Sequence, residues 1–484
     1  MMQKKKVIVV GGGMAGSSAT FYLQKWVKEK GLPIETLLIE GKDRLGGKVQ
    51  TVVKDGFVVE RGPDSYLKRK QSMTKLVEEL GLGDKIVSNT AGKSYVYARG
   101  KLNVMPKGAF MGIPVEVRPF IFSGLFSPLG KLRAGFDFIL PASKPKADQS
   151  IGAFLRYRFG DQAVNNLIEP LLAGIYAGDI DEMSLMSIFP MFYEVEQKYG
   201  SVIRGIQKMM PKTPKQSNSS FKVNSRKGMF NTVTTGLESI IHAIEARLDE
   251  GSVMKNTRVL RIEKLAQGYH VYLSNQQVLF ADAMILATEG RALAKMFPKD
   301  DKLAWFGNQR ATTVGNVALV FSKSAIEKDI DGTGFLVARN NGFAITATTW
   351  THKKWPHSAP DDKVLLRCYV GRPGEEGIVS QADEEITSVV LEDLRKTMNI
   401  TKDPEWAIIS RWEEAMPQYT VGHKERIHKA KAYMRENFPG IYFGGGSYEG
   451  SGLPDCIDQG IAAVQNILEF LALSDQRESV PIVV

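Results

Sequence analysis

The chain has 484 residues, of which 43% are hydrophobic and 24% charged, and its two cysteines, Cys368 and Cys456, are far apart. These values are typical of a multi-domain globular protein and exclude a collagen-like fibre, a largely disordered chain and a disulfide scaffold. The net charge of +10 favours an anionic partner but does not indicate which kind. The sequence contains no nucleic-acid-binding motif. We therefore expect no nucleic acid partner, no metal site and a cytoplasmic location.

The first forty residues predict a dinucleotide site. A short apolar strand over 6–10 leads into a glycine cluster and then into a helix over 17–30. Gly11, Gly13 and Gly16 fit GxGxxG, in which the glycines allow a tight turn, approach of a pyrophosphate and close helix–strand packing. A second strand, over 36–39, ends in Glu40, at the spacing where an acid holds a ribose hydroxyl. The expected contacts here are Gly11, Gly12, Gly13, Met14, Ala15, Gly16 and Glu40.

The residues after Glu40 indicate which dinucleotide binds. Arg44, Gly47 and Lys48 lie in an ExxxRxGG arrangement, where glycines let the chain pass close to phosphates and Arg44 adds positive charge. This arrangement resembles the GG motif of the FAD-dependent amine-oxidase superfamily. A strand over 283–288 that contains Ala287, and a glycine run over 444–446 followed by a helix over 454–473, resemble two further nucleotide-binding parts of that superfamily. FAD is therefore the expected cofactor.

The middle of the chain predicts two further parts. Helical patterns dominate from about 105 to 209, a Pro-, Lys- and Ser-rich stretch follows, and strand-like runs come after it. The expected fold class is α/β with α+β: a discontinuous Rossmann-like FAD-binding domain, a mixed-sheet substrate domain and a helical insertion. We expect FAD-binding parts at 1–65, 225–292 and 436–484, a substrate-domain segment at 66–90 and its sheet at 293–435. The helical domain is expected at 91–208 and a flexible connector at 209–224.

Four blocks carry a closer resemblance. They are Glu60–Leu67, Glu169–Asp179, Arg411–Tyr419 with Gly422 and His423, and Gly452–Gly460. Together they resemble the protoporphyrinogen oxidase family, along essentially the whole chain. The closest likeness is to the Gram-positive branch, whose members oxidise coproporphyrinogen III. The resemblance implies flavin-dependent oxidation of a porphyrinogen with O2 as acceptor, in haem biosynthesis.

The resemblance also implies site residues. Family positions near FAD correspond here to Gly62, Pro63, Asp64, Ser65, Val259, Trp412, Gly452, Leu453 and Pro454. Pocket positions correspond to Lys70, Ile175 and Tyr369, although a solvated helix charge, plain core and a packed strand aromatic explain these three equally simply. No catalytic side chain is identified, because the flavin carries the chemistry.

Several alternatives stay open at this stage. The expected substrate is coproporphyrinogen III, with protoporphyrinogen IX as the nearest rival, followed by another superfamily activity and by a non-enzymatic FAD-binding module. Residues 118–140 place Phe, Ile and Leu between basic residues, which fits either a wall of the helical domain or weak peripheral contact with an anionic membrane. Contact with a ferrochelatase is a hypothesis from the order of the pathway.

Overall fold

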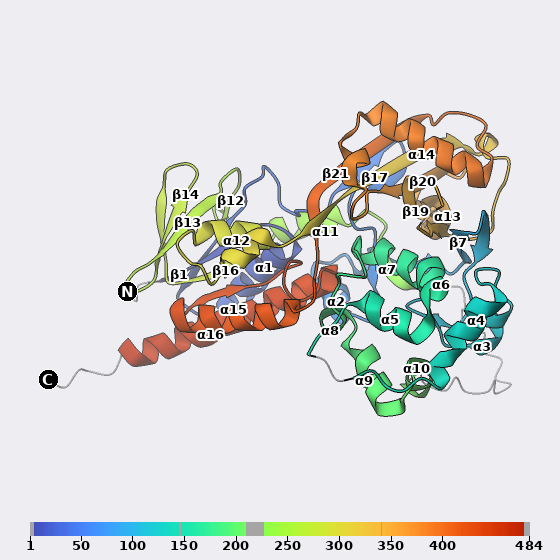
Figure 1. The fold of residues 1–484 in the computed structure, drawn as a ribbon. Helices are drawn as coiled ribbons and strands as arrows, with labels where there is room; N and C mark the ends of the chain where they lie inside the picture. Colours follow the sequence, from blue (N-terminus) through green and yellow to red (C-terminus); the bar gives the residue numbers. More distant parts are fainter. Residues whose placement is uncertain (1–3, 145–146, 210–226, 340, 479–484) are drawn as a thin grey trace, which may run out of the picture.

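The computed structural model describes residues 4–144, 147–209, 227–339 and 341–478. Figure 1 shows a sheet domain that carries both ends of the described chain, a second sheet domain crossed by α14, and a group of helices below that second sheet. The connector expected at 209–224 lies outside the described residues, apart from Met209. Among the described residues, no helix has both the length and the hydropathy that crossing a membrane requires.

The first sheet is parallel and is assembled from three distant chain regions. Its strand order is β12-β2-β1-β16-β22, with parallel pairing throughout. The strands are β12 (Val253–Met254), β2 (Ile34–Ile39), β1 (Lys5–Val10), β16 (Ala283–Leu286) and β22 (Ile441–Phe443). Residues 7–10 of β1 are all buried, which is typical of a parallel strand covered on both faces. The discontinuous Rossmann-like domain expected from the sequence is confirmed.

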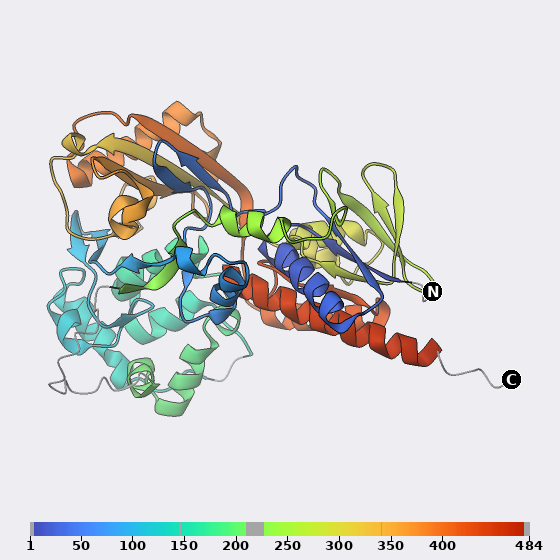
Figure 2. The same ribbon diagram turned by 180° about the vertical axis from the view of Figure 1, so that it is seen from behind.

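Helices cover one face of this sheet and a small antiparallel sheet lies over the other. On the first face α1 (Met14–Lys30) and α16 (Leu453–Glu478) run side by side (Figure 2). They share a core with α11 (Glu238–Glu245) and α2 (Gln71–Glu79). The opposite core is formed with β13 (Val259–Lys264), β14 (Tyr269–Leu273), β15 (Val278–Ala281), α12 (Gly290–Met296) and α15 (His423–Asn437).

The second large sheet is mixed and has the strand order β21-β17-β20-β19-β18-β7-β8. Its strands are β21 (Trp406–Pro417), β17 (Ala311–Ser322), β20 (Lys363–Val370), β19 (Ile345–Trp350), β18 (Gly334–Val337), β7 (Ser94–Ala98) and β8 (Lys101–Val104). Side chains of α14 (Asp383–Met398) complete its core. The expected boundary at residue 91 assigned the β7–β8 hairpin to the helical domain. The structure places it at the edge of this sheet, because β18 offers β7 a parallel partner.

The helical part has a core of its own, formed by residues between 96 and 206 with Ala338. Its helices are α3 (Val117–Ile121), α4 (Pro128–Gly135), α5 (Ile151–Phe159), α6 (Asp161–Ala163), α7 (Glu169–Tyr176), α8 (Leu185–Ile188), α9 (Pro190–Tyr199) and α10 (Val202–Met209). Short turns of helix lie at η2 (Phe136–Phe138) and η3 (Val164–Ile168), and β9 (Ala109–Phe110) pairs with β10 (Ile113–Pro114).

Two small antiparallel units connect the domains. The hairpin of β3 (Thr51–Lys54) and β4 (Phe57–Glu60) turns at Asp55 and Gly56, which both have positive φ, as two-residue hairpin turns require. This hairpin leads directly into the Glu60–Ser65 segment. A second unit pairs β11 (Lys227–Val233) with β5 (Tyr66–Leu67) and β6 (Ile86–Thr90). The remaining short elements are η1 (Gly83–Lys85), η4 (Ala304–Asn308), η5 (Lys323–Ala325), α13 (Thr351–Lys354), η6 (Pro356–Ser358) and η7 (Glu376–Ser380).

Candidate active site

The first glycine motif forms the turn between β1 and α1. Gly11 has a φ of +99°, and a Cβ atom there would lie 2.7 Å from the carbonyl oxygen of Ala287. A Cβ atom on Gly16 would lie 1.8 Å from the carbonyl oxygen of Gly11, so helix and strand touch through their backbones. Gly13 differs, because nothing lies within 4 Å of its Cβ position. The motif therefore packs tightly on two sides and leaves open space at Gly13.

The N-terminus of α1 is suited to bind an anion. Gly13 is its N-cap, no side chain caps the helix among the described residues, and its first turn contains no acid. The backbone N–H groups of a first helical turn have no partner within the helix, and the helix dipole favours negative charge there. Pyrophosphate oxygens fit this position.

Glu40 lies beside the same turn. Its carboxylate accepts hydrogen bonds from the backbone N–H groups of Gly12, at 2.6 Å, and Lys42, at 2.8 Å. These bonds fix the carboxylate at the end of β2, next to the glycine turn, where a ribose hydroxyl can donate to its remaining acceptor positions.

The second glycine loop is stacked on the first. The N–H of Gly46 donates to the carbonyl oxygen of Gly12 at 2.7 Å, and Gly13 and Gly46 form a parallel bridge. A Cβ atom on Gly47 would lie 3.2 Å from the Cα atom of Gly13. Two loops this close leave backbone, not side chains, along the proposed pyrophosphate path.

Arg44 holds this loop in shape. Its guanidinium donates to the carbonyl oxygens of Leu45, Gly47 and Val49 at 2.8–3.0 Å, and to Glu238 on α11 at 3.1 Å. These four bonds give Arg44 a positioning role, and the positive charge that the sequence predicted near the phosphates stays a prediction.

The other two chain regions close the site. Ala287 donates to the carbonyl oxygen of Val10 at 2.8 Å, and the buried Oγ1 of Thr288 has no hydrogen-bond partner in the described part of the chain. A Cβ atom on Gly460 of α16 would lie 2.7 Å from the carbonyl oxygen of Ala15, so α16 packs directly on α1. Val259 is buried at the start of β13. An unpartnered buried hydroxyl beside the open glycine turn fits a polar ligand.

The Glu60–Ser65 segment is held in place by side chains that donate hydrogen bonds to its backbone carbonyl oxygens. Trp412 Nε1 donates to the carbonyl oxygen of Arg61, and Arg367 Nη2 donates to that of Gly62, both at 2.8 Å. A Cβ atom on Gly62 would lie 2.0 Å from the carbonyl oxygen of Lys48, so this segment touches the second glycine loop. Pro63 and Ser65 lie in the same segment. The structure thus brings two predicted cofactor-binding segments into backbone contact.

Asp64 is the charged centre of that segment. Its side chain forms ion pairs with Lys354, at 2.9 Å, and with fully buried Arg367, at 3.4 Å. Burial alone would raise the pKa of this carboxyl, but the two cations overcome that effect and hold the pKa well below its usual range. Asp64 is therefore a fixed negative charge near neutral pH.

The three predicted pocket residues come from three different elements. Tyr369 is on the same face of β20 as Arg367, whose guanidinium lies 5.5 Å from the Tyr369 ring centroid. Lys70, at the N-cap of α2, forms an ion pair with Asp455 in the first turn of α16. Ile175 is 45% exposed near the end of α7. Tyr369 thus contacts the arginine that holds the Gly62 carbonyl, and Lys70 contacts the first turn of α16, whereas Ile175 presents an exposed apolar side chain.

Gly452, Leu453 and Pro454 form the start of α16 beside this ion pair. Ser72 Oγ donates to the carbonyl oxygen of Pro454 at 3.2 Å, which ties α2 to that helix start. Burial, followed by the charge of Asp455, raises the pKa of Tyr176 to about 12. The Lys70–Asp455 ion pair and the Ser72 hydrogen bond join α2 to the start of α16.

Sequence reasoning missed Arg367 and Lys354. Arg367 stands between the buried Leu366 and Cys368 in an otherwise apolar strand. A lone arginine in such a run was the available signal, because buried charges occur where a partner neutralises them. Lys354 gave no signal, since it lies among other basic residues at the end of α13.

The arrangement fits FAD. Open space at Gly13, an uncapped helix start, an acid beside it and the orphaned Thr288 hydroxyl converge from three chain regions. Met14 and Ala15, two of the expected cofactor contacts, are the first two residues of α1. When bound, FAD supplies two-electron oxidation.

Comparisons with known proteins agree with this geometry. Residues 14–468 match the family described as flavin containing amine oxidoreductase. The coproporphyrinogen III oxidase of Bacillus subtilis is 49% identical, over 97% of this chain and 99% of that protein. The enzyme of the same name from Staphylococcus aureus is 40% identical, over 96% and 100%. The chloroplastic protoporphyrinogen oxidase of Nicotiana tabacum is 29% identical, over 90% and 81%.

Solved structures show the same fold. A crystal structure from Exiguobacterium sp. 255-15, described provisionally as a protoporphyrinogen oxidase, has a TM-score of 0.85 and 36% identity, covering 97% of this chain and 100% of its own. A putrescine oxidase mutant matches with a TM-score of 0.67 at 17% identity, covering 96% and 99%, and supports the fold alone.

Proposed function

The chain belongs to the flavin containing amine oxidoreductase family, and on that premise we propose that it oxidises coproporphyrinogen III to coproporphyrin III with O2 as the electron acceptor. It is an FAD-dependent oxidoreductase. The observation that carries the choice of substrate is the near full-length identity of 49% and 40% to two enzymes named for that reaction.

In this reaction the cofactor, and not a side chain, accepts the electrons. Converting a porphyrinogen into a porphyrin removes six electrons and six protons, which a two-electron cofactor accomplishes in three rounds, with three H2O2 formed from O2. The protein holds the macrocycle and the cofactor together, excludes water and accepts protons. The Glu60–Ser65 segment suits this holding role, since Trp412 and Arg367 fix its carbonyls.

We assign cofactor contacts to the glycine turns, the Glu60–Ser65 segment and the start of α16, and substrate contacts to Lys70, Tyr369 and Ile175. Substrate propionates are carboxylates, so one of them can replace Asp455 as the partner of Lys70. Tyr369 and Ile175 offer the aromatic and apolar surface that a tetrapyrrole needs. Lys70→Met should therefore raise KM more than it lowers kcat.

Protoporphyrinogen IX is the second candidate substrate. It is favoured by the provisional description of the Exiguobacterium structure and by the plant relatives. It carries two propionates where coproporphyrinogen III carries four, so the two substrates differ in the number of carboxylates that a cation such as Lys70 can bind.

Aerobic turnover of the purified holoprotein tests the proposal. Each porphyrinogen is supplied separately while porphyrin fluorescence and H2O2 are followed together. We expect faster oxidation of coproporphyrinogen III, with about three H2O2 per porphyrin. Faster oxidation of protoporphyrinogen IX would mean that the second candidate is the substrate. Absence of turnover with FAD bound would contradict both candidate substrates.

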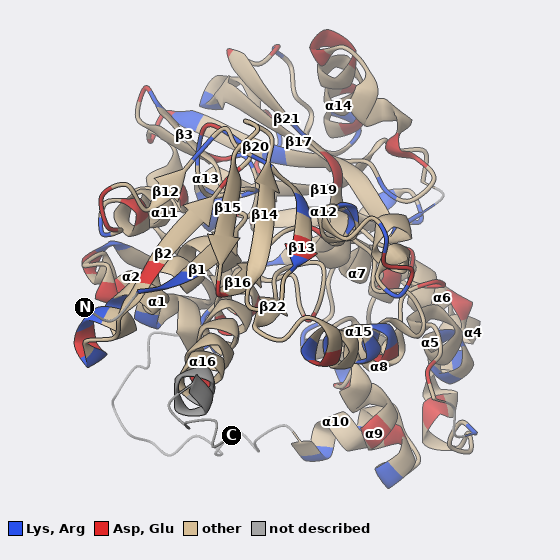
Figure 3. Ribbon diagram, turned by 90° about the vertical axis from the view of Figure 1, so that its left-hand side faces the viewer, with Lys and Arg blue, Asp and Glu red and all other residues tan. Residues whose placement is uncertain are grey.

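A surface on α3, α4 and η2 supports peripheral contact with an anionic membrane. Its exposed apolar side chains are Phe122 (78% exposed), Leu129 (78%), Leu132 (60%) and Ile139 (75%). Lys131 and Arg133 stand between them. Apolar anchors flanked by cations bind weakly to anionic headgroups. By contrast, Figure 3 shows basic and acidic positions interspersed along α15.

Co-sedimentation with vesicles tests this surface. Binding should require phosphatidylglycerol and should fall when Leu129 and Ile139 are both changed to Ser, whereas Val53→Ser, an exposed apolar change on β3, should have no effect. Equal binding by the wild type and both variants contradicts the assignment.

A second partner hypothesis is that the product is transferred directly to a ferrochelatase. A porphyrin-transfer rate equal to that of free diffusion contradicts it.

A further inference from the structure

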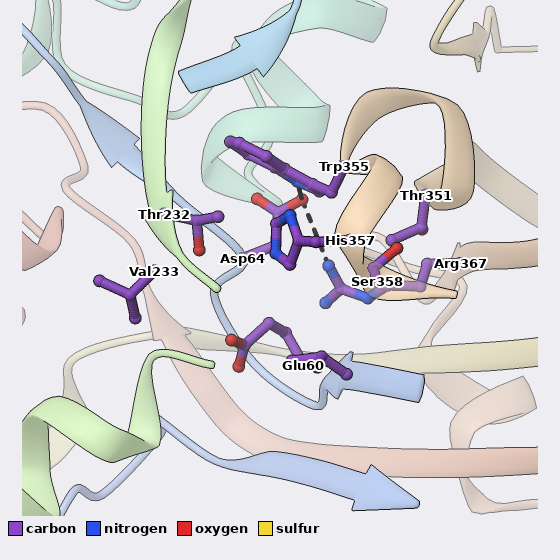
Figure 4. A pocket seen from close by; sticks show the side chains of 10 residues that line it. Glu60, Asp64, Thr232, Val233, Thr351, Trp355, His357, Ser358 and Arg367 are labelled. Carbon is purple, nitrogen blue, oxygen red and sulfur yellow. Dashed lines mark hydrogen bonds and ion pairs between the residues drawn. The ribbon is translucent and has the colours of Figure 1, made fainter. Parts of the chain in front are cut away.

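A small cavity lies beside the Glu60–Ser65 segment. It is lined by residues of β4, β11, β20 and the turn from α13 into η6. Figure 4 shows Glu60, His357 and Arg367 around this space. Its free space suits a single water molecule. We call it the Glu60 cavity, defined by Glu60, Asp64, Thr232, His357, Ser358 and Arg367.

The walls of the Glu60 cavity contain polar atoms without partners. Arg367 is fully buried; its Nη1 lies 3.4 Å from Asp64 as an ion pair, whereas its Nε has no hydrogen-bond partner within the described part of the chain. The buried Oγ of Ser358 also has no hydrogen-bond partner there. Buried donors are rarely left unsatisfied, and an ordered water with two to four polar partners satisfies them.

Glu60 is a buried carboxyl with well-defined neighbours. Its Oε1 accepts from the N–H of Leu237 at 2.6 Å, and its Oε2 accepts from Thr51 Oγ1 at 2.8 Å. Burial raises the pKa of this carboxyl to about 7, even though these two hydrogen bonds and the charge of Arg367 oppose the rise. It therefore gains or loses a proton with a small change in the local field.

The charges that act on Glu60 come from four elements. Arg367 on β20 favours its ionised form, whereas Asp64 disfavours it. His357 on η6 lines the same cavity, and Lys354 on α13 acts through Asp64. Glu238 on α11 accepts from the N–H of Thr51 at 2.8 Å and completes the set. Charge added near these neighbours therefore shifts the protonation of Glu60.

His357 connects the Glu60 cavity to the surface. It is half-buried, next to exposed Pro356 and buried Ser358. Burial lowers the pKa of its imidazole, so the ring is neutral near pH 7 and can both accept and donate a proton. It is the cavity residue best placed to exchange protons with solvent.

We propose that Glu60 takes up a proton from solvent, through His357 and a water in the Glu60 cavity, each time the cofactor accepts electrons. The inference rests on the assignment of the Gly62–Ser65 segment as a cofactor contact. Reduction adds negative charge beside that segment, which raises the proton affinity of a nearby carboxylate. Glu60 then forms an O–H bond with a proton that enters from solvent, and no electron moves in this step. Reoxidation reverses it.

Anaerobic reduction of the holoprotein by dithionite, with a pH-indicator dye in weak buffer, measures this uptake. No porphyrinogen is present, so failure of the substrate proposal does not affect the result. Wild-type protein should bind more protons per electron pair than Glu60→Gln, with the largest excess near pH 7. Equal uptake by the two proteins overturns the proposal. Glu413→Gln, an exposed carboxyl on β21, is the matched control and should behave as wild type.

The role of His357 has a separate kinetic test. His357→Ala should leave the number of protons unchanged and slow their uptake about tenfold, with recovery in added imidazole. His428→Ala, an exposed histidine on α15, is the control. A rate unaffected by His357→Ala, or a loss that imidazole does not restore, overturns this part.

A measurement on wild-type protein covers the case in which Glu60→Gln fails to fold. Electrochemical reduction should produce a protonated-carboxyl C=O band in the infrared difference spectrum. The band should shift in D2O, as a carboxylic acid does. A difference spectrum without this band overturns the proposal.

Discussion

Two glycines at the start of α1 have opposite surroundings, although they belong to one motif. A side chain at Gly16 meets the carbonyl oxygen of Gly11, whereas a side chain at Gly13 meets empty space. Gly13 has a φ of −70°, which any residue adopts. The absence of a side chain therefore serves packing at Gly16 and ligand approach at Gly13.

We predict that this difference separates folding from cofactor binding. Gly13→Ala should weaken FAD binding roughly tenfold or more with little change in the stability of the apoprotein. Gly16→Ala should destabilise the apoprotein by about 3 kcal/mol, as overpacking does. Isothermal titration and chemical denaturation measure the two quantities. Equal loss of apoprotein stability in both variants contradicts the distinction.

Glu60 makes stability depend on pH in a defined direction. Its pKa is about 7 in the folded protein against an ordinary value of 4.5, so the folded chain binds a proton that the unfolded chain releases. The stabilisation from this proton is complete below pH 4.5 and is lost as the pH rises through 7. The loss is about 3 kcal/mol for a shift of this size.

Comparison with Glu60→Gln isolates that loss. Between pH 4.5 and 8 the free energy of unfolding of wild type should fall by about 3 kcal/mol relative to the variant. Denaturant midpoints of the apoproteins across that range provide the measurement. Parallel pH profiles of the two proteins are incompatible with a buried, titrating Glu60.

At the level of elements, the loop after β2 is tied to α11 through Arg44 and Glu238. Their side chains are 27% and 14% exposed, so solvent weakens the pair only in part. Arg44→Gln should lower FAD affinity about tenfold, because the carbonyls of the loop lose their donor. A double-mutant cycle with Glu238→Gln should give a coupling of about 1 kcal/mol. Additive effects of the two changes exclude coupling through this pair.

The elements that were predictable from sequence are those with a local signal. The strand expected at 6–10 and the helix expected at 17–30 follow from an apolar run and adjacent glycines; the structure has them at Lys5–Val10 and Met14–Lys30. The pairing of β7 with β18 was not predictable, since the partners are more than two hundred residues apart. The site residues named from the sequence remain predictions until a ligand is observed. The proximity of Arg367 and Glu60 was not predictable, because they lie far apart in the sequence and only the fold brings them to the same cavity.

In the whole molecule, FAD contacts are assigned to all three regions that build the parallel sheet. A ligand that binds only the folded state stabilises it by mass action. With free FAD at about 100 times its dissociation constant, the holoprotein should gain about 2.7 kcal/mol over the apoprotein. Thermal denaturation should show a melting temperature that rises with FAD concentration. An unchanged melting temperature means that FAD does not bind at the proposed site.

The assembly of one sheet from three regions also fixes the order in which the protein becomes complete during translation. β1 and β2 leave the ribosome early, but β16 and then β22 join them only after hundreds of further residues. Until β22 has emerged, β16 has an open edge in a sheet that is apolar on both faces. We therefore expect the nascent chain to be prone to aggregation until β22 has emerged. Because the start of α16 is an assigned cofactor contact, we expect FAD to bind only after α16 has packed against α1.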